Sequence, residues 1–336
     1  AVKTLSTYFL DSKIMKEYLS RLVCSLFYRH LVIILNFRVM KNIIISILVV
    51  SAFVSCQKVL ELDEETKTSK LVVNSLFDDQ GRWEVNVSRS LSVLDNGQLS
   101  IIDDAIVSIY EGGNLVSNLI YDGEKYIALG LISSPIAGKE YRVEVSAPNY
   151  NSVSSKDICP VSVPLINVVT DTAINSFNEG VVTFDVTFQD PGGSDNYYGI
   201  GLEITRYYIQ SNTSGGFDTI LSDVYEPYIN STNPIIDNSR TDNFSQTLTF
   251  KDNLIEGERT TLSFDYSYYY ISSPNEYIVS KIKFYSFSEA TYNYTKSYEA
   301  FRNTDGNPFA EPVQVYTNVE NGFGIFGGRS IYELEF

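Results

Sequence analysis

Apolar and polar residues alternate in short runs along most of the chain after residue 69. The first two runs, KLVVNSLF (70–77) and RWEVNVSRS (82–90), lie on either side of a DDQG turn. A period of two places alternate side chains on opposite faces of a strand, so Trp83, Val85 and Val87 are expected to share one face. The alternation therefore predicts a β-hairpin at this point.

Four more strands are expected in the next part of the chain, at 105–110, 115–121, 125–129 and 140–147. Short strands at regular spacing, separated by GG and DG turns, are typical of a sandwich. The pattern predicts an immunoglobulin-like β-sandwich over residues 70–160. Residues 158–169 contain two prolines, which suit an extended crossing segment more than a central strand.

A second β-rich domain is expected over residues 165–336, so the predicted fold class is all-β. Its strands are expected at 181–191, 196–209, 245–250, 260–271 and 276–287. Residues 211–243 are rich in Ser, Thr, Asn and Asp, which predicts a long surface loop. Segment 158–169 is too apolar for a free linker, so the two parts are expected to pack together.

One C-terminal helix is predicted over residues 288–303 (SEATYNYTKSYEAFRN). Ser288 suits the N-cap position, and Tyr294, Tyr298 and Phe301 recur at helical spacing. The chain after the helix is extended and then glycine-rich. Its glycines at 322, 324, 327 and 328 predict a backbone that another part of the chain approaches closely.

The segment MKNIIISILVVSAFVSC (40–56) has the pattern of a bacterial lipoprotein signal peptide. A basic start, an apolar middle and a small residue before the cleavage point are typical of a signal, here 40–55. The cysteine directly after it, Cys56, is the expected lipidation site. Several acyl chains on Cys56 would hold the protein on a bilayer. The polar, acidic residues 57–69 that follow Cys56 then form a tether.

Residues 1–39 are expected to lie upstream of the working protein, because signal peptides start at a true N-terminus and Met40 is the natural start. The alternative is a membrane helix over residues 18–37. That stretch contains Arg21, Arg29 and His30, and its longest uncharged run is short for a span.

The part of the chain that follows the signal is strongly acidic. The whole chain has 25 Lys+Arg and 41 Asp+Glu residues, and residues 1–55 contain seven basic and two acidic ones. The remainder has a net charge of −21. Because such a surface repels phosphate backbones, nucleic acid is not an expected partner.

The sequence offers little for catalysis after Cys56. The chain's one histidine is His30, so a Ser-His-Asp or Cys-His arrangement is not expected. The usual zinc ligands are also missing, and no metal or cofactor is predicted. With Cys24 upstream and Cys56 lipidated, Cys159 has no disulfide partner and is expected to be a small apolar filler at a strand end.

Two clusters are candidates for binding. Tyrosines at 266, 268, 269, 270 and 277 crowd two strands, so Tyr266, Tyr268, Tyr269, Tyr270 and Tyr277 are a possible binding face. The alternative, which we favour, is that they fill half-exposed sheet positions. The segment DPGGSDN (190–196) offers oxygen ligands for calcium, but it lacks the EF-hand spacing and an acidic turn is favoured.

The order of several motifs resembles the Bacteroidota outer-membrane lipoproteins classed as domain of unknown function 4249. They are the start at Ser55-Cys56, LVVNSLF (71–77), DDAIVSIY (103–110), GKEYRVEV (138–145), FQDPGGSDNYYGI (188–200), the helix at 288–301 and the close NPFAEPVQVYTNVENGFGIFGG (307–328). The resemblance covers most of 56–336 and supplies no catalytic residues. It implies an accessory lipoprotein of a TonB-dependent outer-membrane receptor that faces the cell surface.

Three functions compete at this point. The expected one is a non-catalytic lipoprotein, anchored in the outer membrane by Cys56, that helps a TonB-dependent receptor to capture nutrients. The alternative is a surface adhesin or a structural protein of the envelope, which an immunoglobulin-like part would suit equally well. A carboxylate-based hydrolase is the third, and no particular pair of acidic residues marks it.

Overall fold

The computed structural model describes residues 15–29, 69–91, 100–130, 134–177, 179–237, 246–268, 275–304, 310–311 and 313–336. The chain divides into two compact units, Ala1–Thr66 and Lys67–Phe336. In the first unit, residues 15–29 form a helix whose residues are all exposed. None of the described helices combines the length and apolarity needed to cross a bilayer. The predicted signal 40–55, Cys56 and the tether up to residue 68 lie outside the described residues.

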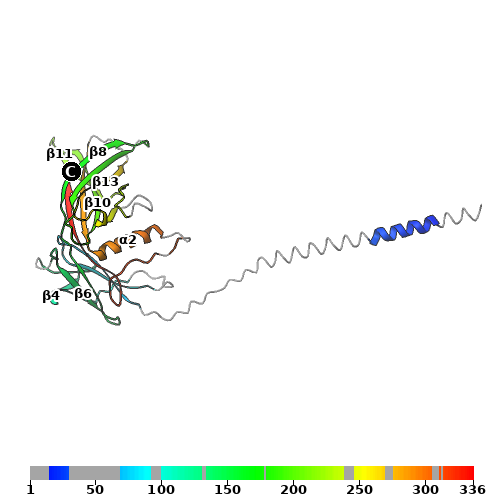
Figure 1. Ribbon diagram of the computed structural model, residues 1–336, viewed down its shortest axis with the longest axis horizontal. Helices are drawn as coiled ribbons and strands as arrows, with labels where there is room; N and C mark the ends of the chain where they lie inside the picture. The colour runs from blue at the N-terminus through cyan, green and yellow to red at the C-terminus, as the bar shows by residue number, and fades with distance from the viewer. Residues whose placement is uncertain are drawn as a thin grey trace, which may run out of the picture. The chain divides into compact units, whose positions relative to one another are not determined.

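The described part of the second unit contains fifteen strands and one α-helix (Figure 1). The strands of its first half are β1 (Leu71–Phe77), β2 (Glu84–Arg89), β3 (Ile106–Glu111), β4 (Asn114–Tyr121), β5 (Tyr126–Ile127), β6 (Glu140–Ser146) and β7 (Val153–Ile158). Those of its second half are β8 (Leu165–Ile174), β9 (Gly180–Gln189), β10 (Tyr197–Ser211), β11 (Phe217–Tyr225), β12 (Thr247–Lys251), β13 (Arg259–Tyr268), β14 (Glu276–Phe287) and β15 (Phe323–Glu335). The α-helix is α2 (Glu289–Thr304), and a 3-10 turn covers Asp252–Leu254. The prediction of an all-β fold class with one C-terminal helix is confirmed.

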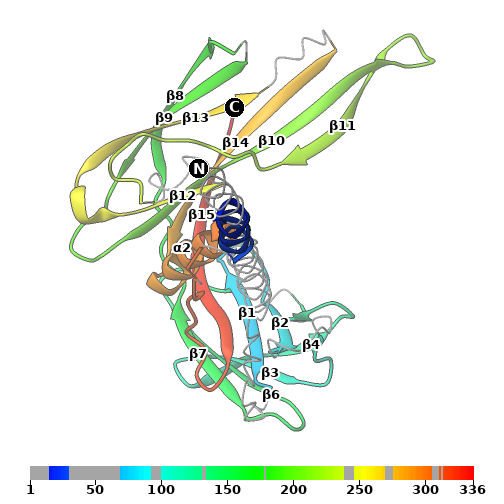
Figure 2. The ribbon, with the colours of Figure 1, turned by 90° about the vertical axis from the view of Figure 1, so that its right-hand side faces the viewer.

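Twelve strands form one sheet in the order β11-β10-β14-β15-β1-β2-β5-β4-β3-β6-β7, with β12 beside β10. The other three form a small sheet in the order β13-β9-β8. Strand β10 pairs with β14 along one edge and shares its other edge between β11 and β12. Figure 2 shows the large sheet running from the β10–β11 ribbon, past α2, to β3 and β6.

The C-terminal strand β15 joins the two halves of the large sheet. It pairs in parallel with β1 and antiparallel with β14. A Cβ atom added at Gly322, Gly324, Gly327 or Gly328 would collide with neighbouring atoms, which confirms the predicted close approach. At Gly328 the obstacle is the backbone of Ile158 at the end of β7. Only glycine lets the two backbones come so close.

The core of the first half is completed by a residue from the far end of the chain. Phe326 of β15 packs at a tilt against Phe77, with ring centroids 4.6 Å apart, and the Trp83 ring centroid lies 4.8 Å from that of Tyr141 in the same cluster. Strand β7 lies beside β15. Just before β15 begins, the backbone N–H of Glu320 donates to the carbonyl of Ser154 in β7 at 2.8 Å. The sheet therefore curls around one hydrophobic core from β15 to β7.

Cys159, directly after β7, is fully buried in this core, and its sulfur lies 3.8 Å from Ser330 Oγ. Burial raises the pKa of its thiol to about 11. A thiol with so high a pKa is unreactive at neutral pH, as expected for a filler residue.

The second core lies between the small sheet and one face of β10 and β14. Alternate residues of β10, from Tyr198 to Ile204, face this core, and so do Ile282 and Phe284 of β14. Phe184 and Phe188 of β9 meet them from the small sheet. The period of two leaves Lys283, Tyr285 and Phe287 on the opposite face of β14.

Two predictions about extended segments were wrong. Residues 211–243 were expected to be a surface loop, but they contain β11, whose residues are nearly all exposed. Exposure on both faces removes the apolar alternation by which a strand is recognised. The glycine-rich tail was expected only to approach other chain closely, but it contains β15. Glycine there hides the strand pattern because it contributes no side chain.

The helix begins as the sequence predicts. The backbone N–H of Thr291 donates to Ser288 Oγ at 3.1 Å, so Ser288 is the N-cap. The helix itself covers Glu289–Thr304, one residue later than expected at each end. Tyr292, outside the predicted aromatic stripe, is its most deeply buried aromatic residue, while Tyr298 and Phe301 are partly exposed.

We predict that Phe326→Ala lowers the free energy of unfolding by about 3–5 kcal/mol, because it removes a fully buried ring and leaves a cavity between β1 and β15. Urea unfolding measures the change. Phe177→Ala is the matched control, since that side chain is 82% exposed, and its effect should stay within about 0.5 kcal/mol. Equal effects of the two substitutions would show that β15 does not complete the first core.

Candidate functional site

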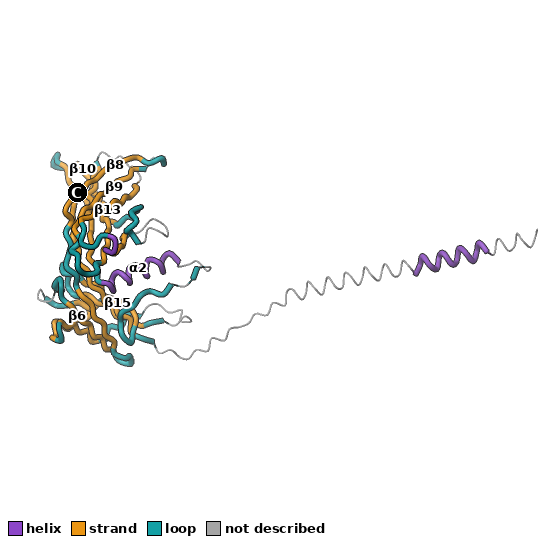
Figure 3. Tube along the Cα trace, in the orientation of Figure 1, coloured by secondary structure: helices purple, strands orange, loops and turns teal. Residues whose placement is uncertain are grey.

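A cleft of about 970 Å³ lies between α2 and the large sheet. Figure 3 shows α2 lying beside the strands of the unit in this region. The cleft is lined by α2, by β14 and β15, and by Leu76 of β1. Further lining residues are Glu226, Tyr228, Asp237, Gln246 and Thr247. Its volume is at the upper end of the usual range for ligand sites, about 300–1,000 Å³.

The floor of the cleft consists of three side-chain pairs across β14 and β15. Lys283 lies opposite Glu333, Tyr285 opposite Ile331 and Phe287 opposite Arg329. The middle pair, Tyr285 and Ile331, carries no charge, and each of the two flanking pairs contains at least one charged residue. Tyr285 and Phe287 are stacked, with ring centroids 5.4 Å apart and an interplanar angle of 19°.

Two glycines of β10 give this floor its aromatic surface. Gly199 and Gly201 lie opposite Tyr285 and Lys283, respectively, on the strand next to β14. A Cβ atom at Gly199 would collide with the ring of Phe287. Because Gly199 has no side chain, the Phe287 ring can lie down over the backbone of β10. The GIG sequence at 199–201 was the local signal for this close approach.

The wall of the cleft is the exposed side of α2. Tyr294 and Tyr298 stack there with centroids 5.8 Å apart and an interplanar angle of 7°. Burial raises the pKa of Tyr294. Tyr285, Tyr294 and Tyr298 all line the cleft, and no hydrogen bond from their hydroxyls to another described residue is present.

Most charged groups of the cleft are paired. Lys283 Nζ lies 2.7 Å from Glu203 and 2.8 Å from Glu226, and Lys296 Nζ lies 3.9 Å from Asp237. Burial alone would lower the pKa of Lys283, but its two carboxylate partners outweigh that effect and the pKa is raised. Lys283 therefore stays charged, and its ion pairs with Glu203 and Glu226 hold the side chain in place.

A hydrogen-bond network fixes the start of α2 against the sheet. Ser288 Oγ donates to Asp157, and the N–H of Gly328 donates to the same carboxylate oxygen at 2.8 Å. Thr291 Oγ1 donates to the carbonyl of Gly328 at 2.8 Å. Burial raises the pKa of Asp157 to about 6, and the hydrogen bonds offset only part of that rise. The network sets the distance between the wall and the floor of the cleft.

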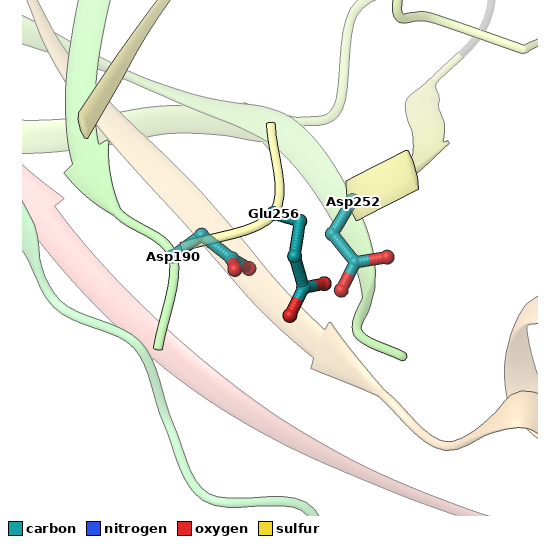
Figure 4. A group of neighbouring side chains, drawn as sticks. All are labelled: Asp190, Asp252 and Glu256. Atoms are coloured by element: carbon teal, nitrogen blue, oxygen red, sulfur yellow. The ribbon is translucent and has the colours of Figure 1, made fainter. Parts of the chain in front are cut away.

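Outside the cleft, Asp190, Asp252 and Glu256 have carboxylate oxygens within 4.8 Å of one another (Figure 4). Asp190 accepts hydrogen bonds from the Tyr198 hydroxyl at 2.5 Å and from the N–H groups of Gly192 and Gly257 at 3.0 and 2.7 Å. Its oxygens thus accept hydrogen bonds from protein donors, and the bond from Gly257 ties the 190–196 turn to the 256–257 loop.

Asp252 of the same cluster is also committed to the protein. It accepts hydrogen bonds from the backbone and side chain of Asn196, at 2.6 and 3.2 Å. Burial raises its pKa, the bonds from Asn196 lower it, and the nearby Asp190 and Glu256 raise it further. A proton shared within the cluster would relieve the repulsion between these carboxylates.

The structure places the predicted tyrosines on two different sheets. Tyr266, 4% exposed, packs in the second core, and Tyr268 lies tilted against it with ring centroids 5.7 Å apart. Both lie on β13 of the small sheet. Tyr277 lies on β14 of the large sheet and stacks on Tyr207 of β10. Tyr269 and Tyr270 lie outside the described residues, and the other three do not line the cleft described here.

The family model with the description "Domain of unknown function (DUF4249)" matches residues 57–335. The chain belongs to this family. The match to domain of unknown function 4249 that the order of the motifs indicated is therefore confirmed. The match covers every strand of the second unit and the whole of α2.

Comparison with curated proteins gave no match for this chain. A solved structure, the collagen binding domain of Erysipelothrix rhusiopathiae surface protein RspB, is similar over 78% of this chain and 94% of that chain, with 9% identity and a TM-score of 0.16. A likeness at this level supports no conclusion about the fold or the function of this chain.

We predict that the stability contribution of Asp157 depends on pH. Its raised pKa means that the folded state binds a proton more tightly than the unfolded state. The contribution is therefore fully present below about pH 4 and is lost as the pH rises through about 6. Asp157→Asn, which cannot ionise, should gain stability relative to wild type between these values. Chemical unfolding at several pH values measures this, with exposed Asp103→Asn as control. A difference that stays constant with pH would contradict the assignment.

We also predict that Asp190→Asn lowers the free energy of unfolding by about 1.5–3 kcal/mol, since charged hydrogen bonds from two backbone N–H groups are lost. Asp195→Asn, at an exposed position of the same turn, should have little effect. Calcium chloride should leave the melting temperature of the wild type unchanged, because protein donors already occupy Asp190. Stabilisation by calcium that disappears in Asp190→Asn would instead establish a cation site.

Proposed function

We propose that this chain is a non-catalytic lipoprotein of the outer membrane, anchored through acylated Cys56 and accessory to a TonB-dependent receptor in nutrient capture. In this proposal the second unit faces the cell surface and presents the cleft to solutes. The fold is then an immunoglobulin-like sandwich over 70–160 followed by a second β-rich domain over 165–336. The curled sheet around Trp83 supports the sandwich assignment.

The observation that carries the proposal is the chemistry of the cleft. Its lysines are held in ion pairs, and tyrosine hydroxyls lie beside its stacked rings. Such groups position a ligand by stacking and hydrogen bonding, whereas a catalytic acid or base must be free to exchange a proton. The lack of histidine after Cys56 supports the same conclusion.

The location of the family match supports the anchor. The matched region starts at residue 57, directly after Cys56, and extends to residue 335. A domain that follows the lipidated residue at once is the arrangement expected of a mature lipoprotein. The acidic segment 57–69 would then separate the acyl chains from β1.

The second candidate is a surface adhesin or a structural protein of the envelope. It is favoured by the exposed edge strands β8 and β11, which display Ile174 and Phe217 at 69% and 74% exposure. Long edge strands with apolar side chains are templates for pairing with another chain. A purified protein that binds matrix material and no receptor would favour this candidate.

We expect wild-type protein to incorporate labelled palmitate, to sediment with outer membranes and to bring down a β-barrel receptor after gentle detergent extraction. Cys56→Ala should lose the label and the membrane association, because no acyl chains remain to anchor it. Cys24→Ala, upstream of the signal, is the control and should behave as wild type. Identical fractionation of Cys56→Ala and wild type would overturn the anchor. Recovery without any barrel partner would overturn the accessory role.

A further inference from the structure

The α2 cleft has four properties that together restrict what it can bind. They are its charge balance, the free hydroxyl groups, the stacked aromatic rings and the absence of an open strand edge in its floor. Each property excludes a class of ligand. The inference rests on the proposed binding role and specifies its ligand.

Charge balance argues against an ionic ligand. Lys283, Lys296 and Arg329 each lie within 4.0 Å of a carboxylate, from Glu226, Asp237 and Asp78 respectively. An anionic ligand would have to displace these carboxylates and would meet the field of a protein with net charge −16. A cationic ligand would have to displace the lysines. A neutral ligand can accept and donate hydrogen bonds without breaking any of these pairs.

The floor of the cleft also argues against an extended peptide. Strand β14 is paired on both sides, by β10 and β15, and β15 is paired by β14 and β1. The backbone N–H and C=O groups of the floor are therefore used within the sheet. A peptide that binds as an added strand needs a free edge, and the floor offers none.

The aromatic rings and hydroxyls match a ring-shaped, hydroxyl-rich ligand. Tyr294 and Tyr298 provide nearly parallel faces on the wall, and Tyr298 is 42% exposed. Tyr285 contributes a hydroxyl from the floor. Such rings stack on the apolar C–H faces of a sugar, while the hydroxyl groups and carboxylates around them bond to its rim. Arg302, in the last turn of α2, adds a side chain with several N–H donors at the end of the wall.

We propose that the cleft between α2 and β14–β15 is a binding site for a neutral oligosaccharide. One sugar ring stacks on Tyr298 and Tyr294, and its hydroxyls bond to Tyr285 Oη and to carboxylates of the rim such as Glu226. The volume of about 970 Å³ accommodates a short oligosaccharide. The rigid attachment of α2 through Asp157 keeps wall and floor at a fixed separation, which lowers the entropy cost of binding.

Calorimetry on the full chain in detergent tests the proposal with maltohexaose, cellohexaose, xylohexaose and mannohexaose as probes. At least one should bind with a dissociation constant below about 1 mM. Tyr298→Ala should weaken that binding about tenfold or more by removing the stacking face. Tyr285→Phe, which removes only a hydroxyl, should weaken it by about three- to tenfold. Tyr208→Ala is the matched control, since Tyr208 is 49% exposed on β10 and does not line the cleft.

Three results would overturn the proposal. They are no binding of any neutral probe, binding that Tyr298→Ala and Tyr285→Phe leave unchanged, and a preference for hexagalacturonate or for a neutral hexapeptide. Receptor recovery from the same preparation separates this proposal from the accessory role. If the receptor is recovered and no sugar binds, only the ligand assignment fails. If sugar binds and no receptor is recovered, only the accessory role fails.

Discussion

The close approach of β15 to its neighbours is the constraint on which the rest of the second unit depends. Its glycines let the backbone lie against β1, β7 and α2 at distances that any Cβ atom would prevent. Phe326 on this strand closes the first core, while its pairing with β14 extends the sheet toward the second. One strand thereby couples two hydrophobic cores, and losing its packing would expose both.

The cleft is a consequence of that strand. Helix α2 starts where β14 ends, and the network of Asp157, Ser288 and Gly328 ties its first turn to β15. The helix then crosses the sheet face that β14 and β15 share. Because Gly199 has no Cβ atom, the ring of Phe287 can lie against the backbone of β10 at the floor of the cleft. The same small residues thus permit the fold and shape the site.

Much of the fold followed from local pattern. The strand at Glu276–Phe287 and the alternation at Trp83, Val85 and Val87 were predictable, because each buried face repeats every second residue. The helix was predictable from Ser288 and the spacing of its aromatics. Strands β7, β8, β11 and β15 were missed. Strand β11 is exposed on both faces, and β15 contains glycine where side chains would mark the pattern.

The sequence by itself determined the strand periods, the helix cap, the acidic charge and the family to which the chain belongs. The site was decided by tertiary structure, because its parts are far apart in the chain: Leu76, Glu226, Tyr285 and Arg329 meet only after β15 has paired with β1 and β14. The crowded tyrosines of β13 and β14 were separated for the same reason. Neighbours in sequence entered different sheets, and only long-range pairing, which local propensity does not encode, assigns a strand to its sheet.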